Sequence, residues 1–469
     1  RWSMTFMSRR LRSLGLATTS ALVLVSGCAS LQDRASSLWP FGGDRAKNAI
    51  AEDKERISVL GLEEQLTKDP ALESVVVTVP EAQDLSSWPN AGGVASNAPQ
   101  NVSGSGPLAI VWRKKIGQGA GARGAITATP IVADGKLFVF DSKSTVHAVD
   151  QANGREIWRK SLVPASKARG RFFNRDESTA IGGGIAFGDG KVYAATGFGN
   201  LVALNADNGQ EAWRIDAGSP IHASPLAGGG RVFVTSNDSE LFAVEAATGR
   251  IQWTQSAIAE PARMLSSPSP ALVGETLVAP FASGEVIAYL SANGRRLWSE
   301  ALTRAGSSNS LSTINDIAGR PVVAGGIVFA ASQSGTFAAI ELRTGTRVWE
   351  KAIASIQTPW VAGDFVYVVS TTGELVAMDV KTGGIKWTRQ LPSYRNEKKK
   401  KNLISWTGPV MVGGRLVLAS SLGKIEVVKP EDGTTLFTRD AKAPIFVPPA
   451  IANGTLYFYT HDGVVVAVR

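Results

Sequence analysis

One short pattern recurs along most of the chain and restricts the folds that the chain can adopt. In seven places an aromatic residue follows a glycine by four positions, after a run of β-forming residues, and an earlier tryptophan stands without the glycine. The aromatic residues are Trp112, Trp158, Trp213, Trp253, Trp298, Trp349, Trp387 and Phe437. Their mean spacing of about 46 residues is typical of one four-stranded propeller blade.

The two ends of the repeated region are incomplete in complementary ways. The first copy, residues 110–114, holds only a final strand, and the last copy, residues 454–469, stops before its aromatic residue. If both pieces form one blade, the ring closes and the last sheet is not left one strand short with an open edge. We therefore expect an all-β protein whose residues 108–469 form an eight-bladed β-propeller of four-stranded blades, the last blade being closed by an N-terminal strand.

The residue composition limits the chemistry that the chain can perform. The 469 residues include 49 glycines, and 44% of them are hydrophobic, which excludes global disorder. The sole cysteine, Cys28, excludes an intrachain disulfide, a multi-cysteine metal site and an attached c-type haem. The three histidines, His147, His222 and His461, are far apart in the sequence. We therefore expect no catalytic residue, no metal and no cofactor.

The first 27 residues have the pattern of a secretory signal peptide. Arg9, Arg10 and Arg12 precede an apolar stretch, residues 14–25, that is too short to span a bilayer. The following Val-Ser-Gly-Cys resembles the lipobox of bacterial lipoproteins. This resemblance implies lipidation of Cys28 and, because the next residue is alanine, sorting to the outer membrane.

A polar segment, residues 28–107, separates the signal from the repeats and is predicted to be a mostly irregular tether. Residues 29–107 carry a net charge of −5, and residues 1–27 carry +4. Because the whole chain carries +9, the part from residue 108 onward carries +10. The run Lys398–Lys401 adds to this basic body and suits either an anionic partner or a solvated loop. Nucleic acid is not expected as a partner of an exported lipoprotein.

The repeat Ala-x-(Asp/Asn/Glu)-x-x-(Thr/Asn)-Gly-x-x-x-Trp resembles the tryptophan-docking repeat of quinoprotein-type propellers. Together with the lipobox and the segment 88–93, it is similar to the BamB family, the propeller lipoproteins of the outer-membrane β-barrel assembly machinery. The resemblance implies a non-enzymatic scaffold that is anchored by lipid in the outer membrane and faces the periplasm. It also implies binding to the periplasmic domains of BamA, the barrel-forming subunit. Unfolded outer-membrane proteins are a further candidate partner.

Two inter-blade segments match the region in which that family contacts BamA. Arg263, Met264 and Leu265 belong to the first segment, although a leucine stands where the family carries an arginine. Asp316 and Arg320 belong to the second segment, and Asp316 matches an acidic position of the family. Both segments also suit ordinary turns that lead into the inner strand of a blade.

Two other functions remain open from the sequence. A quinone-dependent dehydrogenase shares the repeat, but resemblance to those enzymes implies adjacent disulfide-bonded cysteines, calcium-binding carboxylates and an aspartate base. The only cysteine here lies in the signal, and the expected channel-facing segments 127–130 and 222–225 hold no carboxylate. The other alternative is a periplasmic propeller that binds glycan or acts as a sensor.

Overall fold

The computed structural model describes residues 66–121, 124–165, 180–260, 266, 268–303 and 316–469. The predicted signal peptide, Cys28 and the first part of the tether lie outside the described residues, as do Arg263, Met264 and Leu265. The described residues belong to one structural unit, Glu64–Arg469.

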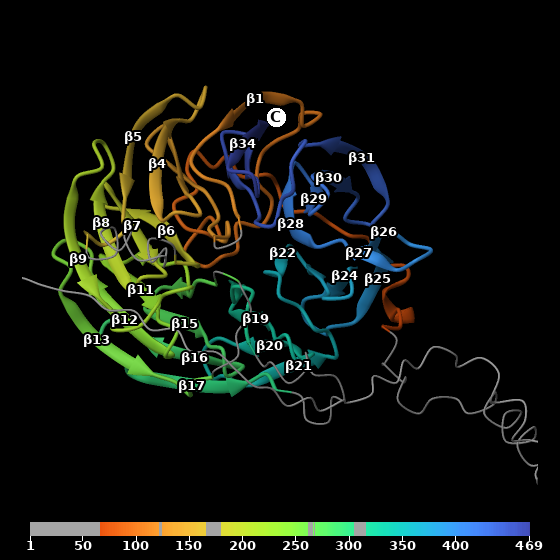
Figure 1. Ribbon diagram of the computed structural model, residues 1–469. Helices are drawn as coiled ribbons and strands as arrows, with labels where there is room; N and C mark the ends of the chain where they lie inside the picture. Colours follow the sequence, from red (N-terminus) through yellow and green to blue (C-terminus); the bar gives the residue numbers. More distant parts are fainter. Residues whose placement is uncertain (1–65, 122–123, 166–179, 261–265, 267, 304–315) are drawn as a thin grey trace, which may run out of the picture. The chain divides into compact units, whose positions relative to one another are not determined.

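Each copy of the repeat forms a four-stranded antiparallel sheet, because its β-branched and aromatic runs alternate with glycine turns. The described residues contain eight such sheets, which follow one another around a central axis (Figure 1), and one two-stranded hairpin. We number the blades 1 to 8 in chain order, each from its inner to its outer strand. The expected eight-bladed propeller is confirmed.

The first four blades follow chain order without a crossover. Their strands are, for blade 1, β2 (Ile131–Ala133), β3 (Lys136–Phe140), β4 (Thr145–Asp150) and β5 (Glu156–Ser161); for blade 2, β6 (Gly183–Gly188), β7 (Lys191–Thr196), β8 (Asn200–Asn205) and β9 (Glu211–Asp216); for blade 3, β10 (Leu226–Gly228), β11 (Arg231–Thr235), β12 (Glu240–Glu245) and β13 (Ile251–Ser256); and for blade 4, β14 (Ala271–Val273), β15 (Thr276–Pro280), β16 (Glu285–Leu290) and β17 (Arg296–Ala301).

Blades 5 to 7 repeat this order, and a hairpin of β26 (Tyr394–Asn396) and β27 (Lys401–Leu403) is inserted between blades 6 and 7. The strands are, for blade 5, β18 (Val322–Ala324), β19 (Ile327–Ala331), β20 (Phe337–Glu341) and β21 (Arg347–Lys351); for blade 6, β22 (Trp360–Ala362), β23 (Phe365–Val369), β24 (Glu374–Asp379) and β25 (Ile385–Gln390); and for blade 7, β28 (Trp406–Val412), β29 (Arg415–Ser420), β30 (Lys424–Val428) and β31 (Thr435–Asp440).

Blade 8 is built from both ends of the repeated region. The strands β32 (Ala450–Ala452), β33 (Thr455–Tyr459) and β34 (Val464–Val468) come from the carboxyl terminus, and β1 (Ile110–Lys115) adds the outer strand. β1 pairs antiparallel with β34, and Trp112 lies opposite Ala467. The backbones of Ala109 and Arg469 exchange two further hydrogen bonds of 2.8 and 3.0 Å. The shared blade closes the ring as the incomplete repeats predict.

The repeated tryptophan of each blade docks on the glycine turn of the next blade. The seven indole nitrogens donate to backbone carbonyls there over 2.7–3.3 Å. A Cβ on the receiving glycine would lie only 2.5–2.7 Å from the ring, and the φ of these glycines is +68° to +78°. Glycine is therefore required both for the turn and for the close approach of the indole. This contact explains why the repeats carry both a turn glycine and a tryptophan.

Phe437 replaces the eighth tryptophan where the ring is spliced. Blade 8 has no turn between β34 and β1 that could receive an indole, because those strands are separate ends of the propeller sequence. Instead, the guanidinium groups of Arg439 and Arg415 lie 4.6 and 5.7 Å from the phenyl centroid. Both arginines donate hydrogen bonds to carbonyls of the segment 104–107, just before β1. Arginine side chains thus supply the cross-blade hydrogen bonds that an indole supplies elsewhere.

Residues 85–102, which we call the collar, make hydrogen bonds to all eight blades. Before it, the chain holds a short 3-10 helix, η2 (Pro70–Leu72), against blade 6 through the bond from the amide of Asp69 to the carbonyl of Ile385. The collar contacts blade 8 through Leu85 and then blades 1 to 7 in order, ending at Val102. The predicted tether is irregular here, but its described part is bound to the ring.

A buried histidine connects blade 1 to the chain that follows β1. His147 lies 3.1 Å from Asp141 through Nε2 and 3.1 Å from Glu156 through Nδ1, and Asp141 also accepts the amide hydrogen of Gln118. Burial opposes the charged imidazolium, but the two carboxylates together raise the pKa of His147 above its usual value. Burial also opposes ionisation of Asp141, and hydrogen bonds from His147 and three backbone amides outweigh it and lower its pKa.

This cluster predicts that stability falls on the alkaline side. A group whose pKa is raised by folding stabilises the protein fully below its unfolded pKa, here about 6.5, and the contribution is lost as the pH rises through the folded pKa. We expect a melting temperature a few degrees lower at pH 9 than at pH 6, and a much smaller difference in His147→Gln. Thermal unfolding at both pH values measures this difference in melting temperature. The same pH dependence in the variant as in the wild type would contradict the contribution assigned to His147.

Candidate functional site

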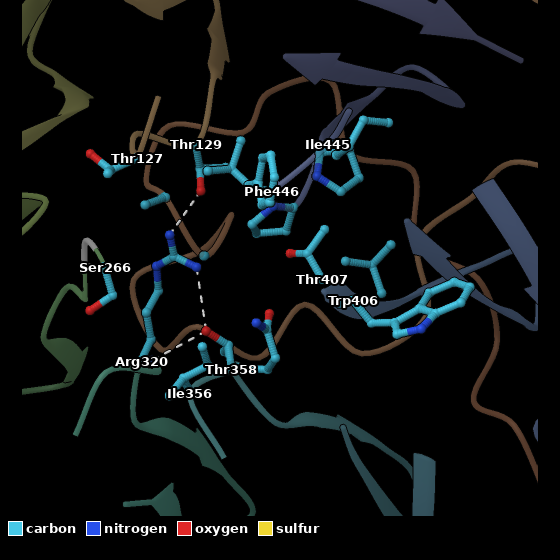
Figure 2. A pocket seen from close by; sticks show the side chains of 18 of the residues that line it. Thr127, Thr129, Ser266, Arg320, Ile356, Thr358, Trp406, Thr407, Ile445 and Phe446 are labelled. Carbon is cyan, nitrogen blue, oxygen red and sulfur yellow. Dashed lines mark hydrogen bonds between the residues drawn. The ribbon is translucent and has the colours of Figure 1, made fainter. Parts of the chain in front are cut away.

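A cavity of about 340 Å³ lies where the collar and the segments that lead into the inner strands converge. Most of its described lining is apolar, including Trp88 of the collar, Trp360 of β22, Trp406 of β28 and Ile445 and Phe446 ahead of β32. The segments before β2 and β18 contribute threonine and arginine side chains. In Figure 2, Thr129, Arg320, Thr358 and Thr407 lie around a common space. The fold thus places an aromatic-walled cavity at the centre of the ring.

Arg320 is the one arginine or lysine among the described residues that line this cavity, and its exposed fraction is only 6%. Its Nη2 donates to the hydroxyl oxygen of Thr129 over 2.8 Å, and its Nη1 donates to that of Thr358 over 3.4 Å (Figure 2). Its Nε has no hydrogen-bond partner. Burial lowers the pKa of the guanidinium to about 10, so it remains charged at neutral pH. Arg320 links blade 5 to blade 1 across the channel.

The cavity lining does not fit the calcium and quinone site of a quinone-dependent dehydrogenase. No aspartate or glutamate occurs among the described residues of the lining, and calcium requires several oxygen ligands, usually carboxylates. Across the described part of the chain, no group of three or more histidine, cysteine, aspartate or glutamate side chains could hold a metal ion. The residues present therefore offer neither the metal ligands nor the aspartate base that such an enzyme needs.

Described residues of both predicted contact segments lie around one small cavity. Ser266 of the first segment and Asp316 of the second line this cavity of about 30 Å³ next to blades 3 and 4. Asp316 is only 5% exposed, and its backbone carbonyl accepts the amide hydrogen of Gln333 over 3.0 Å. Ser266 also lines the central cavity, which holds the Arg320 side chain. Arg320 is predicted from the sequence to lie in a contact loop, but its side chain is buried and lines the central cavity.

The lysine run lies in the inserted hairpin and is separate from both cavities. Lys398–Lys401 occupy the turn between β26 and β27 and the first residue of β27, and all four side chains are exposed. Leu403 at the end of this hairpin is also exposed. Trp406 fixes the base of the insertion, because its indole donates to the carbonyl of Pro392 over 2.9 Å.

The ring and its docked indoles define the class of protein: an eight-bladed propeller of tryptophan-docking repeats. The family described as "Outer membrane protein assembly factor BamB" matches residues 108–175 and 142–389, which together are more than half of the chain. The chain therefore belongs to this family. Among curated relatives, the outer membrane protein assembly factor BamB of Yersinia pestis is 25% identical over 358 residues, covering 76% of this chain and 88% of that protein.

Solved structures show the same fold in proteins with different names. BamB from Moraxella catarrhalis superimposes with a TM-score of 0.59 at 22% identity, over 78% of this chain and 98% of that one. The quinohemoprotein alcohol dehydrogenase from Comamonas testosteroni gives a TM-score of 0.63 at 14% identity, over 82% and 81% of the two chains. At these identities the likeness shows the fold alone, because one fold supports many functions.

A search of the described residues for membrane-spanning helices finds no helix with the length and apolar character to cross a bilayer.

Proposed function

We propose that this protein is a non-catalytic scaffold of the outer-membrane β-barrel assembly machinery. The match to the family of outer membrane protein assembly factors over more than half of the chain carries this proposal. The absence of carboxylates from the described lining of the central cavity supports a scaffold over a quinone-dependent enzyme. The ring assists the insertion of outer-membrane proteins by holding its partner, and unfolded outer-membrane proteins remain a second candidate ligand.

The partner that we propose is the periplasmic part of BamA. The contact surface is formed by the segment around Arg263, Met264 and Leu265 and by the segment 315–321, which contains Asp316 and Arg320. The convergence of Ser266 and Asp316 on one small cavity supports a single surface made by both segments. Arg320 belongs to the same chain segment but lies inside the channel, so it supports this surface from behind. A partner strand could extend the surface by pairing with a blade edge.

A lipid on Cys28 and the acidic tether complete the proposal. The lipid holds the ring at the periplasmic face of the outer membrane, and residues 29–65 lie between the anchor and the described ring. Tethering raises the effective concentration of the ring near its partner, so an interface of modest affinity suffices. The basic charge of the ring accelerates the encounter with an acidic partner surface more than it increases affinity.

The contact surface predicts a selective loss of binding. Joint replacement Arg263→Ala, Met264→Ala and Leu265→Ala should weaken binding to purified BamA periplasmic domains by about tenfold or more, because a few central side chains dominate most interfaces. The melting temperature should stay within about 1 °C of wild type, since surface substitutions change stability little. Calorimetric titration measures the affinity.

The matched control is Arg343→Ala, in the outer turn of blade 5, whose side chain is 85% exposed. It removes one arginine that plays no part in the proposed surface, and its affinity for the same domains should equal that of wild type. Wild-type affinity in the triple variant would refute the assignment of this surface. Unfolding of the triple variant would show that the segment is structural instead.

A further inference from the structure

The central cavity contains a buried cation without a counter-ion. Arg320 is more than nine-tenths buried, and the described residues of the lining include no carboxylate. Its two hydrogen-bond acceptors there are the neutral hydroxyls of Thr129 and Thr358. Neutral hydroxyls offset only part of the cost of removing a charge from water, so a buried arginine is normally paired with an anion. The charge of the Arg320 guanidinium is therefore balanced only when an anion lies in the cavity.

Other hydrogen-bonding groups around the cavity also lack partners. The Nε of Arg320, the indole Nε1 of Trp88, the hydroxyl of Thr407 and the amide oxygen of Asn97 are all buried without a hydrogen bond, and all four residues line the cavity. In Figure 2, the Thr407 hydroxyl and the Arg320 guanidinium point toward each other from opposite walls. Buried polar groups are nearly always satisfied, so these unpaired groups around one space indicate a missing polar partner, and the Nε of Arg320 requires that this partner offer an acceptor.

The remaining walls define the rest of the ligand. Trp360, Trp406, Ile445 and Phe446 give the cavity a large apolar surface, which a fully hydrated anion such as phosphate does not use. The volume of about 340 Å³ lies at the small end of ligand pockets. The two features together fit a small molecule that has one acidic end and an apolar or aromatic body.

We propose that the central cavity binds a small organic carboxylate, with its carboxylate on Arg320 and its apolar body between the aromatic walls. The binding is non-covalent, and no reaction is involved. The site adjoins the proposed BamA contact surface, with which it shares Ser266, but it takes a different kind of ligand, so it goes beyond the scaffold function and can be tested without any partner protein. Arg320 is then a ligand-binding residue whose burial lowers the stability of the empty ring.

The binding test uses the full-length protein and three probes in calorimetric titrations: 4-phenylbutyrate, the neutral 4-phenyl-1-butanol and inorganic phosphate. We expect saturable binding of phenylbutyrate and at least about tenfold weaker binding of the alcohol, because the alcohol cannot make a charge-assisted hydrogen bond to arginine. We expect no measurable binding of phosphate, because this hydrated anion does not use the apolar walls. Arg320→Met should abolish the preference for the acid, whereas the exposed control Arg343→Met should keep it. Absence of phenylbutyrate binding to the wild type, or equal binding of acid and alcohol, would overturn the proposal.

The stability of Arg320→Met separates a ligand site from a structural brace. Replacing an unpaired buried charge with an apolar side chain of similar length should leave the melting temperature of the ligand-free protein unchanged or raise it by a few degrees. Phenylbutyrate should raise the melting temperature of the wild type and leave that of the variant unchanged. A variant that unfolds or melts well below wild type would show that Arg320 is a brace between blades 5 and 1, and would reject the proposal.

Discussion

A chain that begins at residue 117 will fail to form a stable monomer, whereas a chain that begins at residue 66 will fold. The shorter chain lacks β1, which covers the whole of β34 in blade 8. The five residues of β34, Val464–Val468, are apolar and buried in the intact ring, and they would become an open edge. Open apolar edge strands pair with other chains, so we expect aggregation together with the loss of stability.

The chain from residue 117 loses more stability than the removal of β1 alone would cause, because it also lacks the collar, whose hydrogen bonds reach all eight blades. A chain that begins at residue 104 separates the two contributions, since it keeps β1 and loses the collar together with residues 66–84, which contact blade 6 through Asp69. We expect its melting temperature to lie below that of the chain from residue 66 by more than 10 °C. Circular dichroism and light scattering measure unfolding and aggregation. A monomeric, cooperatively folded chain from residue 117 would contradict the shared blade.

Removal of one docking indole will have the second large effect. Trp213→Ala should lower the free energy of unfolding by about 3–5 kcal/mol, the usual range for a large aromatic residue replaced by alanine in a core. The indole is 9% exposed, its Nε1 donates to the carbonyl of Ala246 over 3.0 Å, and its ring covers Gly249 of the next blade. The substitution therefore empties the junction between blades 2 and 3 and leaves the Ala246 carbonyl with only the longer hydrogen bond of 3.4 Å from the hydroxyl of Tyr193.

The matched control is Ile251→Ala in β13 of blade 3, because this side chain is 41% exposed and lies near the same junction. It should cost less than about 1 kcal/mol. Denaturant titration gives both values, provided that each variant unfolds in one transition. A loss for Trp213→Ala no greater than that for Ile251→Ala would mean that the repeated indole does not hold the blades together.

The architecture could be predicted because it rests on local and repeated signals. Each repeat carries a glycine turn and an aromatic residue four positions later, and the structure shows that the tryptophan of one blade contacts the glycine turn of the next blade. The missing aromatic after residue 469 and the extra Trp112 indicated the splice. The change from tryptophan to Phe437 is explained only by the structure, because it depends on the absent turn at the splice.

The collar and the cavity could not be predicted because they depend on contacts between distant residues. One signal was present: residues 85–107 contain no charged side chain, although the rest of the segment 29–107 is rich in charge. A charge-free stretch of this length indicates burial against the ring. Arg320 carried no such signal, because a single arginine before an inner strand can point either into the channel or out to solvent. The distinction requires the position of Thr129, which is 191 residues away.

Affinity purification of the wild-type protein from mildly solubilised membranes, followed by quantitative mass spectrometry, tests the proposed function most directly. The scaffold proposal predicts that BamA is enriched many-fold over a control purification with an unrelated lipoprotein, and that this enrichment falls in the Arg263, Met264 and Leu265 triple variant. Recovery of the intact ring without any enrichment of BamA would contradict the proposed function.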